Sequence, residues 1–478
     1  MEHTEQQSST PITHSNQLLY ALMITAIILP LSEWMLSVSL PIIRDDFGIA
    51  ADSAAWIATA FTLPFMMLMP VYGRISDSIS RRRLLILGIC IFTVGSLLAT
   101  FSTSLASLMV ARVVQGVGVA GLLPLSLALI TGVFPPAQRS QAMGLYSTVG
   151  PVLGVISPIL AGLLVTAWGW RASFIPGALI ALVSILAIHF MTPTSTRRTQ
   201  YKFLKSFDWI GVVFLCATLV SLLFYFSSRP ITGRPPLQDW RLFLGTILFL
   251  GLFIRHENRK PNPFINLHIF KNRALVIGAI SAGLRMLALG GSLGFLMPLY
   301  FADVVQLDPT RTGFYLMVNP VAMTLFVRYG SRLSGRFGSR VIGIAGFAVI
   351  TAVMLTFSQL PADAPHWLIV LLLFIFGTGT GLMLAVLHQA ALDEVPTADL
   401  GTASGIYSMI RFLGSACGAA FGGAILQFYL DQNGATQLSA YQHAFLWFAG
   451  FAILGLFTAT FLPQITPPQL YGQSAQAN

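Results

Sequence analysis

The amino-acid sequence predicts an all-helical protein that crosses a membrane many times. Of its 478 residues, 55% are hydrophobic and only 9% are charged, whereas soluble domains carry roughly 25% charged residues. A soluble fold so poor in charge would have too little polar surface to cover itself, and lipid requires no such cover. The apolar residues gather in long runs, and these must be helical because lipid offers no partner to exposed backbone groups.

The apolar runs are long enough to span a bilayer. About 20 residues are needed, because ~30 Å of hydrocarbon is crossed at ~1.5 Å per residue. We expect about fourteen spanning helices on this criterion. In order along the chain, the runs cover residues 18–43, 51–73, 84–101, 104–134, 142–167, 171–192, 207–227, 240–256, 274–301, 311–330, 339–358, 366–391, 398–428 and 442–463.

The distribution of Lys and Arg predicts the orientation in the membrane. If the first tail is cytoplasmic, about eighteen basic residues fall in inside loops and about six in outside loops, as the positive-inside rule requires. An even number of spans then places both termini in the cytoplasm. The net charge of +10 is therefore mostly a topology signal, and no nucleic-acid partner is expected.

The chain repeats itself weakly at an offset of about 261 residues. Gly116 and Gly118 correspond to Gly377 and Gly379 at this offset. Two related halves, with the substrate site at their interface, are a known plan of transporters. The predicted organisation is a cytoplasmic tail at 1–17, a six-helix half at 18–192, linkers with two extra helices at 193–273, a second six-helix half at 274–463 and a tail at 464–478.

A glycine, an acidic residue and a basic cluster follow the second apolar run. Gly73 lets two helices approach closely, and Asp77 suits a helix N-terminus, where the macrodipole favours negative charge. The loop resembles the signature loop between helices 2 and 3 of the major facilitator superfamily, and this resemblance implies a conformational latch. A plain positive-inside loop is the alternative. The residues assigned to the latch are Gly73, Arg74, Asp77, Arg81 and Arg82.

The fourth apolar run contains an arginine. Arg112 and Gln115 are three residues apart in sequence and share a helix face. Together with Gly116 they are similar to the Arg-x-x-Gln-Gly motif of the superfamily's helix 4. An arginine within a span is costly and by default functional, and the resemblance implies that Arg112 takes part in proton coupling. The alternative is a side chain that reaches the membrane surface.

The fifth apolar run is rich in glycine and proline. Small residues let helices cross closely, and proline bends a helix. The run resembles the helix-5 motif of the antiporter branch, although Ser157-Pro158 and Ala161-Gly162 stand where that motif has its Gly-Pro and Gly-Gly pairs. The resemblance implies antiport, whereas ordinary glycines and prolines of a membrane helix are the alternative. The assigned residues are Gly150, Pro151, Gly154, Pro158 and Gly162.

The order of these motifs makes the whole chain resemble the fourteen-helix drug:proton antiporter branch of the major facilitator superfamily. That branch includes exporters of quaternary ammonium compounds and other lipophilic drugs. The resemblance implies two pseudo-symmetric six-helix halves plus two inserted helices, in the plasma membrane of a bacterium. We therefore expect a monomeric, proton-coupled exporter of a small lipophilic, cationic drug that works by alternating access, with the proton as coupling ion and no other cofactor.

One acidic residue lies deep in an apolar run. Glu33 stands where the family usually has an acid in helix 1. A low dielectric favours the neutral carboxyl, and a nearby cation favours the carboxylate, so a switch between wet and dry surroundings makes Glu33 take up and release a proton. A cationic substrate would expel that proton by competing for the carboxylate. The hypothesis is that Glu33 carries the coupling proton with Arg112 as its partner; a satisfied Glu at the outer interface is the alternative.

Arg285 complicates the choice of substrate. It lies near the middle of the 274–301 run, and a cation facing the cavity would favour anionic or amphiphilic substrates. The alternatives are that it faces Glu33 or a lipid headgroup. A dedicated exporter of a lipid or of an amphiphilic or anionic metabolite therefore remains the second functional hypothesis. The full set of cavity candidates is Glu33, Trp34, Gln115, Arg285, His388 and Gln389.

Catalytic and metal-binding patterns are not found. The histidines are scattered, and no Walker-type loop appears in the sequence, which argues against a membrane-embedded enzyme and an ATP-driven pump. The three cysteines, Cys90, Cys216 and Cys417, all lie in apolar runs, so neither a disulfide framework nor a metal site is expected.

Overall fold

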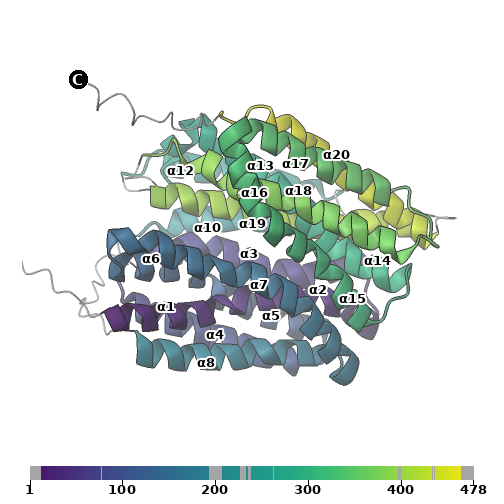
Figure 1. Cartoon of the computed structure of the whole chain (residues 1–478), viewed down its shortest axis with the longest axis horizontal. Helices are drawn as coiled ribbons and strands as arrows, with labels where there is room; N and C mark the ends of the chain where they lie inside the picture. The colour runs from purple at the N-terminus through teal and green to yellow at the C-terminus, as the bar shows by residue number, and fades with distance from the viewer. Residues whose placement is uncertain are drawn as a thin grey trace, which may run out of the picture.

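The computed structural model describes residues 12–76, 78–192, 207–226, 233–234, 238–261, 263–396, 400–432, 434 and 436–464. These residues form helices joined by turns and short loops, and no strand occurs among them. The helices before residue 192 and those after residue 272 form two bundles side by side, with their long axes roughly aligned (Figure 1). The predicted all-helical class is confirmed.

In the first bundle, several helical segments join end to end into longer spans. The pairs α1–α2, α5–α6 and η1–α8 each cross as one unit. Helix α2 ends at Gly48, whose φ of +59° suits a residue without a side chain. The segments are α1 (Ile12–Ala26), α2 (Ile28–Phe47), α3 (Ala51–Ile75), α4 (Arg81–Thr100), α5 (Leu105–Val119), α6 (Leu122–Val133), α7 (Pro136–Trp168), η1 (Trp170–Phe174) and α8 (Ile175–Met191).

The second bundle follows a pair of helices, α10 (Trp209–Phe226) and α12 (Trp240–Glu257). Its first span is built from three segments, of which the middle one, η3, is a π-helix. Such wide turns are rare and occur frequently at functional sites. The segments are η2 (Leu267–Lys271), α13 (Arg273–Ala288), η3 (Leu289–Leu296), α14 (Met297–Asp303), α15 (Pro309–Leu316), α16 (Val318–Phe337), α17 (Ser339–Phe357), α18 (His366–Leu392), α19 (Leu400–Leu430) and α20 (Gln437–Ala459).

Twelve spans in the described part of the chain are long and apolar enough to cross a membrane. The expected count of about fourteen is not confirmed, because the runs at 240–256 and 311–330 are not among the twelve. The first of these forms α12, an 18-residue helix that includes three charged residues. The second forms α15 and α16, and α16 carries three arginines. Charge at the ends of α12, and along the second half of α16, therefore lowers the hydropathy of both segments.

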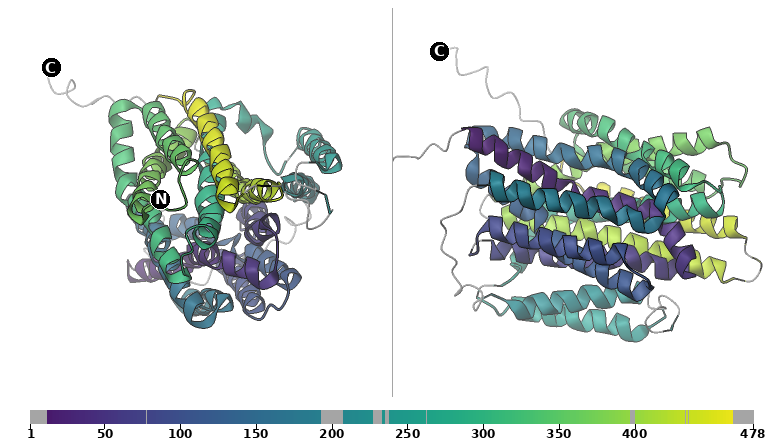
Figure 2. Two further views of the ribbon diagram at one scale, coloured as in Figure 1. Left: turned by 90° about the vertical axis from the view of Figure 1, so that its right-hand side faces the viewer. Right: turned by 90° about the horizontal axis from the view of Figure 1, so that it is seen from below.

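Helices α10 and α12 pack against each other along the side of the bundles, and α10 touches α3 and α19 (Figure 2). Asp208 closes one end of the pair, where its Oδ1 hydrogen-bonds to Nε2 of His256 at 2.8 Å and accepts from Nζ of Lys260 at 3.3 Å. Burial raises the pKa of Asp208, but bonds from His256, the N–H of Gly211 and Lys260 outweigh it, so its pKa lies below the usual value. The carboxylate therefore ties both helices together.

Candidate functional site

A cavity of about 120 Å³ lies between the two bundles. Its wall is largely apolar and combines residues of α2, α3 and α5 from the first bundle with residues of α13, η3 and α19 from the second. The charged residues on the wall are Glu33 and Arg112. Two residues that are distant in sequence and opposite in charge therefore face one cavity between the bundles.

Arg112 is held rigidly in the first bundle. Its side chain is 1% exposed, so the guanidinium does not reach the membrane surface. Its Nε donates to the carbonyl oxygen of Ile57 at 3.2 Å, and its Nη1 donates to Oε1 of Gln115 at 2.8 Å. Nε2 of Gln115 in turn donates to Oγ of Ser96 at 2.9 Å, and the guanidinium lies 4.3 Å from the centroid of the Phe61 ring. Gln115 thus positions Arg112 and does not line the central cavity.

Glu33 differs from Arg112 because its carboxylate is not fixed. Among the described residues, no donor makes a hydrogen bond to it, and it lies partly exposed on the cavity wall beside Trp34. The cations that act on it electrostatically are Arg112 and Arg411, which come from α5 and α19. A carboxyl that faces open space and two cations, without a fixed donor, is free to exchange a proton or to meet a charged ligand.

Glycines bring the helices around Arg112 into contact. A Cβ atom at Gly116 would lie 2.2 Å from the carbonyl oxygen of Phe61 on α3, and one at Gly95 would lie 2.7 Å from the backbone nitrogen of Gln115. Only glycine permits backbones to approach this closely. Helix α5 therefore lies against both α3 and α4, which is the arrangement that lets Arg112 reach the carbonyl group of Ile57.

A methyl group at Gly116 is expected to destabilise the protein. The added Cβ would push α5 away from α3, and overpacking of this kind costs about 1–3 kcal/mol. We expect Gly116→Ala to lower the unfolding temperature of the detergent-solubilised protein. Gly144→Ala serves as the control, because a Cβ there meets nothing within 4 Å. Equal unfolding temperatures for the two variants would contradict the importance of this close contact.

The second bundle contributes an arginine that sequence reasoning left open. Arg285 on α13 is 2% exposed, which excludes a position against lipid headgroups. The groups that act on it electrostatically are Tyr407 and Arg411 on α19, so it does not face Glu33. Arg285 is not on the wall of the cavity, although the next residue, Met286, is.

The other two cavity candidates lie away from the cavity. His388 and Gln389 are exposed residues of α18 and are absent from its wall. The imidazole of His388 instead packs edge-on against the ring of Tyr407, with 5.0 Å between the ring centroids. The structure therefore brings Glu33, Trp34 and Arg112 together on the cavity wall. His388 and Gln389 do not belong to this group.

The arginines of the expected latch bind backbone carbonyl groups. Arg74 Nη2 donates to Pro263 at 3.3 Å, Arg81 Nη1 donates to Ala128 at 2.7 Å, and Arg82 donates to His189. The expected close helix contact at Gly73 is wrong, because a Cβ there would meet nothing within 4 Å. Asp77 lies outside the described residues. The loop is therefore tied to neighbouring helices and to the segment after α12 by its basic side chains.

Part of the helix-5 motif forms a contact between the bundles. A Cβ at Gly162 of α7 would lie 2.5 Å from the carbonyl oxygen of Pro309. In the same way, a Cβ at Gly313 of α15 would lie 2.2 Å from the carbonyl oxygen of Pro158 on α7. At Gly154 a Cβ would lie 3.1 Å from Cβ of Pro320. Helix α7 thus crosses α15 and α16 closely. The expected packing role does not extend to Gly150, where a Cβ meets nothing within 4 Å.

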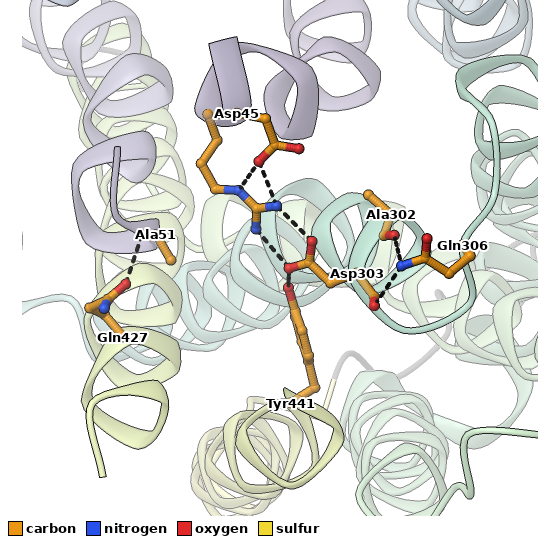
Figure 3. Close-up of polar contacts among 8 residues, drawn as sticks. Asp45, Ala51, Ala302, Asp303, Gln306, Gln427 and Tyr441 are labelled. Carbon is orange, nitrogen blue, oxygen red and sulfur yellow. Dashed lines mark hydrogen bonds and ion pairs between the residues drawn. The ribbon is translucent and has the colours of Figure 1, made fainter. Parts of the chain in front are cut away.

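A polar network that sequence reasoning missed joins the bundles at the expected outer end. Arg44 at the end of α2 donates through Nη1 and Nη2 to both oxygens of Asp303 at the end of α14, at 2.7 and 2.6 Å. The hydroxyl of Tyr441 donates to the same carboxylate at 2.5 Å (Figure 3). Nearby, the N–H of Ala51 donates to Oε1 of Gln427 at 3.0 Å. We call the residues Arg44, Asp303 and Tyr441 the outer network.

A second cavity lies at the opposite end of the molecule. Its volume is about 710 Å³, and it lies between Arg74 of the first bundle, the segment after α12 and Thr402 of the second bundle. Among the described residues, the two bundles are therefore joined at one end by the outer network, and a cavity lined mainly by the segment that connects them lies at the other end. Arg44 and Asp303 are 259 residues apart in sequence, which is close to the repeat offset of about 261. They therefore stand at nearly equivalent positions of the two halves. Opposite charges at such positions are the sequence signal that could have predicted this contact.

Known proteins provide a family and a fold for comparison. A family model described as Major Facilitator Superfamily matches residues 22–419 and 291–477. The riboflavin transporter RibZ of Clostridioides difficile is 30% identical over 391 residues, which cover 81% of this chain and 83% of the relative. The multidrug resistance protein Stp of Mycobacterium tuberculosis is 28% identical, with 84% and 74% covered. Multidrug resistance protein 3 of Bacillus subtilis is 26% identical, with 80% and 73% covered.

Solved structures show the same arrangement of helices. A peptide transporter POT in complex with sulfate has a TM-score of 0.67 at 16% identity, and the match covers 92% of this chain and 93% of the other. A bacterial homologue of the human lysosomal transporter Spinster has a TM-score of 0.64 at 14% identity, with 94% and 97% covered. Similarity at this level of identity describes the fold and not the substrate.

Proposed function

The chain belongs to the major facilitator superfamily, and we propose that it exports a lipophilic small molecule in exchange for protons. Membership of this family makes the chain a multi-pass membrane transporter and not an enzyme. The proposal adds three features to that family assignment: the proton as coupling ion, the outward direction of transport and the lipophilic character of the substrate. It also places the chain in the plasma membrane of a bacterium, as a monomer in the bilayer with both termini cytoplasmic.

The observation that carries the proposal is the position of Glu33. Its unbonded carboxyl shares the wall of the cavity between the bundles with Arg112. When the bundles rock and the cavity opens to one side, water favours the carboxylate; when the cavity is closed, the low dielectric favours the protonated form. Arg112 is fixed by Ile57 and Gln115 and keeps a constant positive charge nearby. This charge stabilises the carboxylate of Glu33 after it has lost its proton.

Exchange follows if the substrate and the proton compete for the same group. A cationic centre of the substrate that approaches Glu33 would stabilise the carboxylate and expel the proton. The apolar part of the substrate would lie against the wall formed by residues such as Leu36, Phe61, Leu289 and Phe295. Apolar walls with few polar groups suit lipophilic compounds of varied shape, and relatives named as multidrug resistance proteins agree with this substrate class.

The second hypothesis, a dedicated exporter of an acidic amphiphile, keeps one specific observation in its favour. Arg285 is buried in the second bundle close to Arg411, and two cations beside the cavity suit a substrate that carries an anionic group. This hypothesis uses the same fold and the same proton carrier, and it differs in the chemistry of the substrate.

Proton coupling is tested by measuring substrate and proton fluxes together. The purified protein is reconstituted in liposomes with a pH gradient and a pH-sensitive dye inside, and ethidium or rhodamine 123 is added outside. We expect both compounds to accumulate against their concentration gradient only while the pH gradient lasts, and to accelerate its collapse relative to protein-free liposomes. Accumulation that persists after the pH gradient is collapsed by an ionophore, or accumulation without proton movement, would contradict the proposal.

A further inference from the structure

The buried charges at the centre of the bundles do not balance. Three arginines lie there, Arg112 on α5, Arg285 on α13 and Arg411 on α19, whereas Glu33 is the only acid away from the ends of the described spans. With Glu33 ionised, this region carries an excess of two positive charges. Charges within a membrane protein are costly and are usually paired or functional, so the excess requires a source of negative charge.

Arg285 is the clearest case of an unpaired cation. Its side chain is 2% exposed, and its Nε and Nη1 atoms have no hydrogen-bond partner in the described part of the chain. Buried guanidinium groups normally donate to carboxylate or carbonyl oxygens, as Arg112 does, because an unpaired buried donor loses its hydration without compensation. Arg285 therefore presents donor atoms for which the described part of the chain supplies no acceptor.

Arg411 lies next to Arg285 and shares this property in part. The Nε atom of Arg411 is also buried, and no described residue makes a hydrogen bond with it. Its guanidinium lies 4.8 Å from the ring centroid of Phe412. The two arginines act on each other electrostatically. Two like charges this close repel each other in the empty protein, and an anion between them would remove both the repulsion and the unmet hydrogen bonds.

The two arginines come together because α13 and α19 cross at glycines. A Cβ at Gly414 would lie 2.1 Å from the carbonyl oxygen of Gly283, so the two backbones touch there. Arg285 follows Gly283 by two residues, and Arg411 precedes Gly414 by three. The pair therefore flanks the crossing, and close helix packing fixes the backbone positions of both residues.

Both arginines stand one helical turn from residues on the wall of the central cavity. Residues four apart lie on the same face of a helix. Leu289, four residues after Arg285, lines the cavity, and so does Ser415, four residues after Arg411. The two arginines thus stand on the helix faces that border the cavity, one turn beyond its wall, while Glu33 lies on the wall contributed by the first bundle.

We propose that Arg285 and Arg411 form a subsite for the anionic group of a lipophilic substrate. The planar fork of an arginine matches the oxygens of a carboxylate or phosphate, and the apolar body of the ligand would extend into the central cavity. A substrate that also carries a cationic centre would meet Glu33 with that centre, so a zwitterionic amphiphile uses both ends of the site. The inference rests on the proposed function only in using the same cavity, and it holds whether or not protons are coupled.

Two fluorescent dyes that differ only in an acidic group test this subsite. Rhodamine 110 carries a free carboxylate, and rhodamine 123 is its methyl ester. Binding to the detergent-solubilised full chain is followed by fluorescence anisotropy at fixed pH, with no membrane gradient. We expect the wild type to prefer rhodamine 110, and Arg285→Gln or Arg411→Gln to weaken rhodamine 110 binding by at least about tenfold, since hydrogen bonds to charged groups are strong. Binding of rhodamine 123, which lacks the acidic group, should not weaken.

Matched variants separate this result from general damage. Arg328→Gln removes an exposed arginine of α16 and should leave both affinities unchanged, and Arg285→Lys should retain part of the preference because it keeps the charge. Retained rhodamine 123 binding reports that each variant is folded. Glu33→Gln should keep the preference for rhodamine 110, so failure of proton coupling and failure of the subsite give different results.

The source of the anionic group is distinguished by competition. Displacement of bound rhodamine 110 by lysophosphatidylglycerol but not by naphthoate would identify an anionic lipid as the ligand, and the reverse would identify a soluble aromatic acid; either result supports the subsite. Equal affinity of the wild type for the two rhodamines, no binding of rhodamine 110, or an Arg285→Gln variant that keeps the wild-type preference would overturn it.

Discussion

Replacement of Glu33 by glutamine is expected to abolish proton-driven transport while leaving the cavity intact. Glutamine has nearly the same size as protonated glutamate but cannot release a proton. Since Glu33 makes no side-chain hydrogen bond among the described residues, the substitution breaks no contact. We therefore expect accumulation of rhodamine 123 against its gradient to fall to the level of protein-free liposomes, while exchange of the dye down its gradient continues.

Two variants bracket this prediction. Glu33→Asp keeps a titratable carboxyl at the cavity and should retain part of the proton-driven accumulation. Glu394→Gln removes a carboxyl from an exposed turn after α18 and should behave as the wild type. Full accumulation by Glu33→Gln would move the proton site to another group, and unfolding of that variant would show that Glu33 has a structural role.

Replacement of Asp303 by asparagine is expected to open the outer end of the molecule. Asp303 receives two hydrogen bonds from Arg44 and one from Tyr441, so the substitution leaves the guanidinium without its ion pair across the bundles. Hydrogen bonds to charged groups contribute about 1.5–3 kcal/mol, which corresponds to a shift of roughly tenfold to a hundredfold in the balance between outer-closed and outer-open states.

Access from outside measures this shift. A cysteine introduced at Ser415 on the cavity wall is labelled with a maleimide that does not cross the membrane. We expect faster labelling from the outer side in Asp303→Asn than in the parent. Asp363→Asn, which removes an exposed charge from the loop between α17 and α18, provides the control. The exchange of Arg44 and Asp303 for each other should restore slow labelling, and equal labelling rates in all variants would show that the outer network does not hold this end closed.

The sequence alone predicts the class of fold because spanning helices are local features. Hydropathy and helix length require no knowledge of neighbouring helices, so most of the expected runs coincide with observed spans. The runs at 240–256 and 311–330 are the exception, because charged residues at the ends of α12 and along the second half of α16 make these helices less apolar than a spanning helix usually is. Counting spans from composition is least reliable where a helix carries charge at its ends.

The site could be predicted only where a buried charge marks it. Glu33 and Arg112 stand out in apolar runs, and the structure brings them to one cavity. The contact between Arg44 and Asp303 is not evident, because each residue looks like an ordinary charge at the end of a span. Gly73 shows the opposite error: its place in a familiar motif suggested a close helix contact that the packing does not contain. Such features depend on how helices meet, which local sequence does not specify.

The most direct test of proton exchange at Glu33 is proton release on substrate binding. The purified wild type and Glu33→Gln are mixed with rhodamine 123 in weakly buffered detergent solution, and a pH indicator records the protons released. If the cationic dye displaces the proton of Glu33, the wild type releases up to one proton for each dye bound, and Glu33→Gln binds the dye but releases none. Equal release by the two proteins would contradict the assignment of Glu33 as the proton carrier.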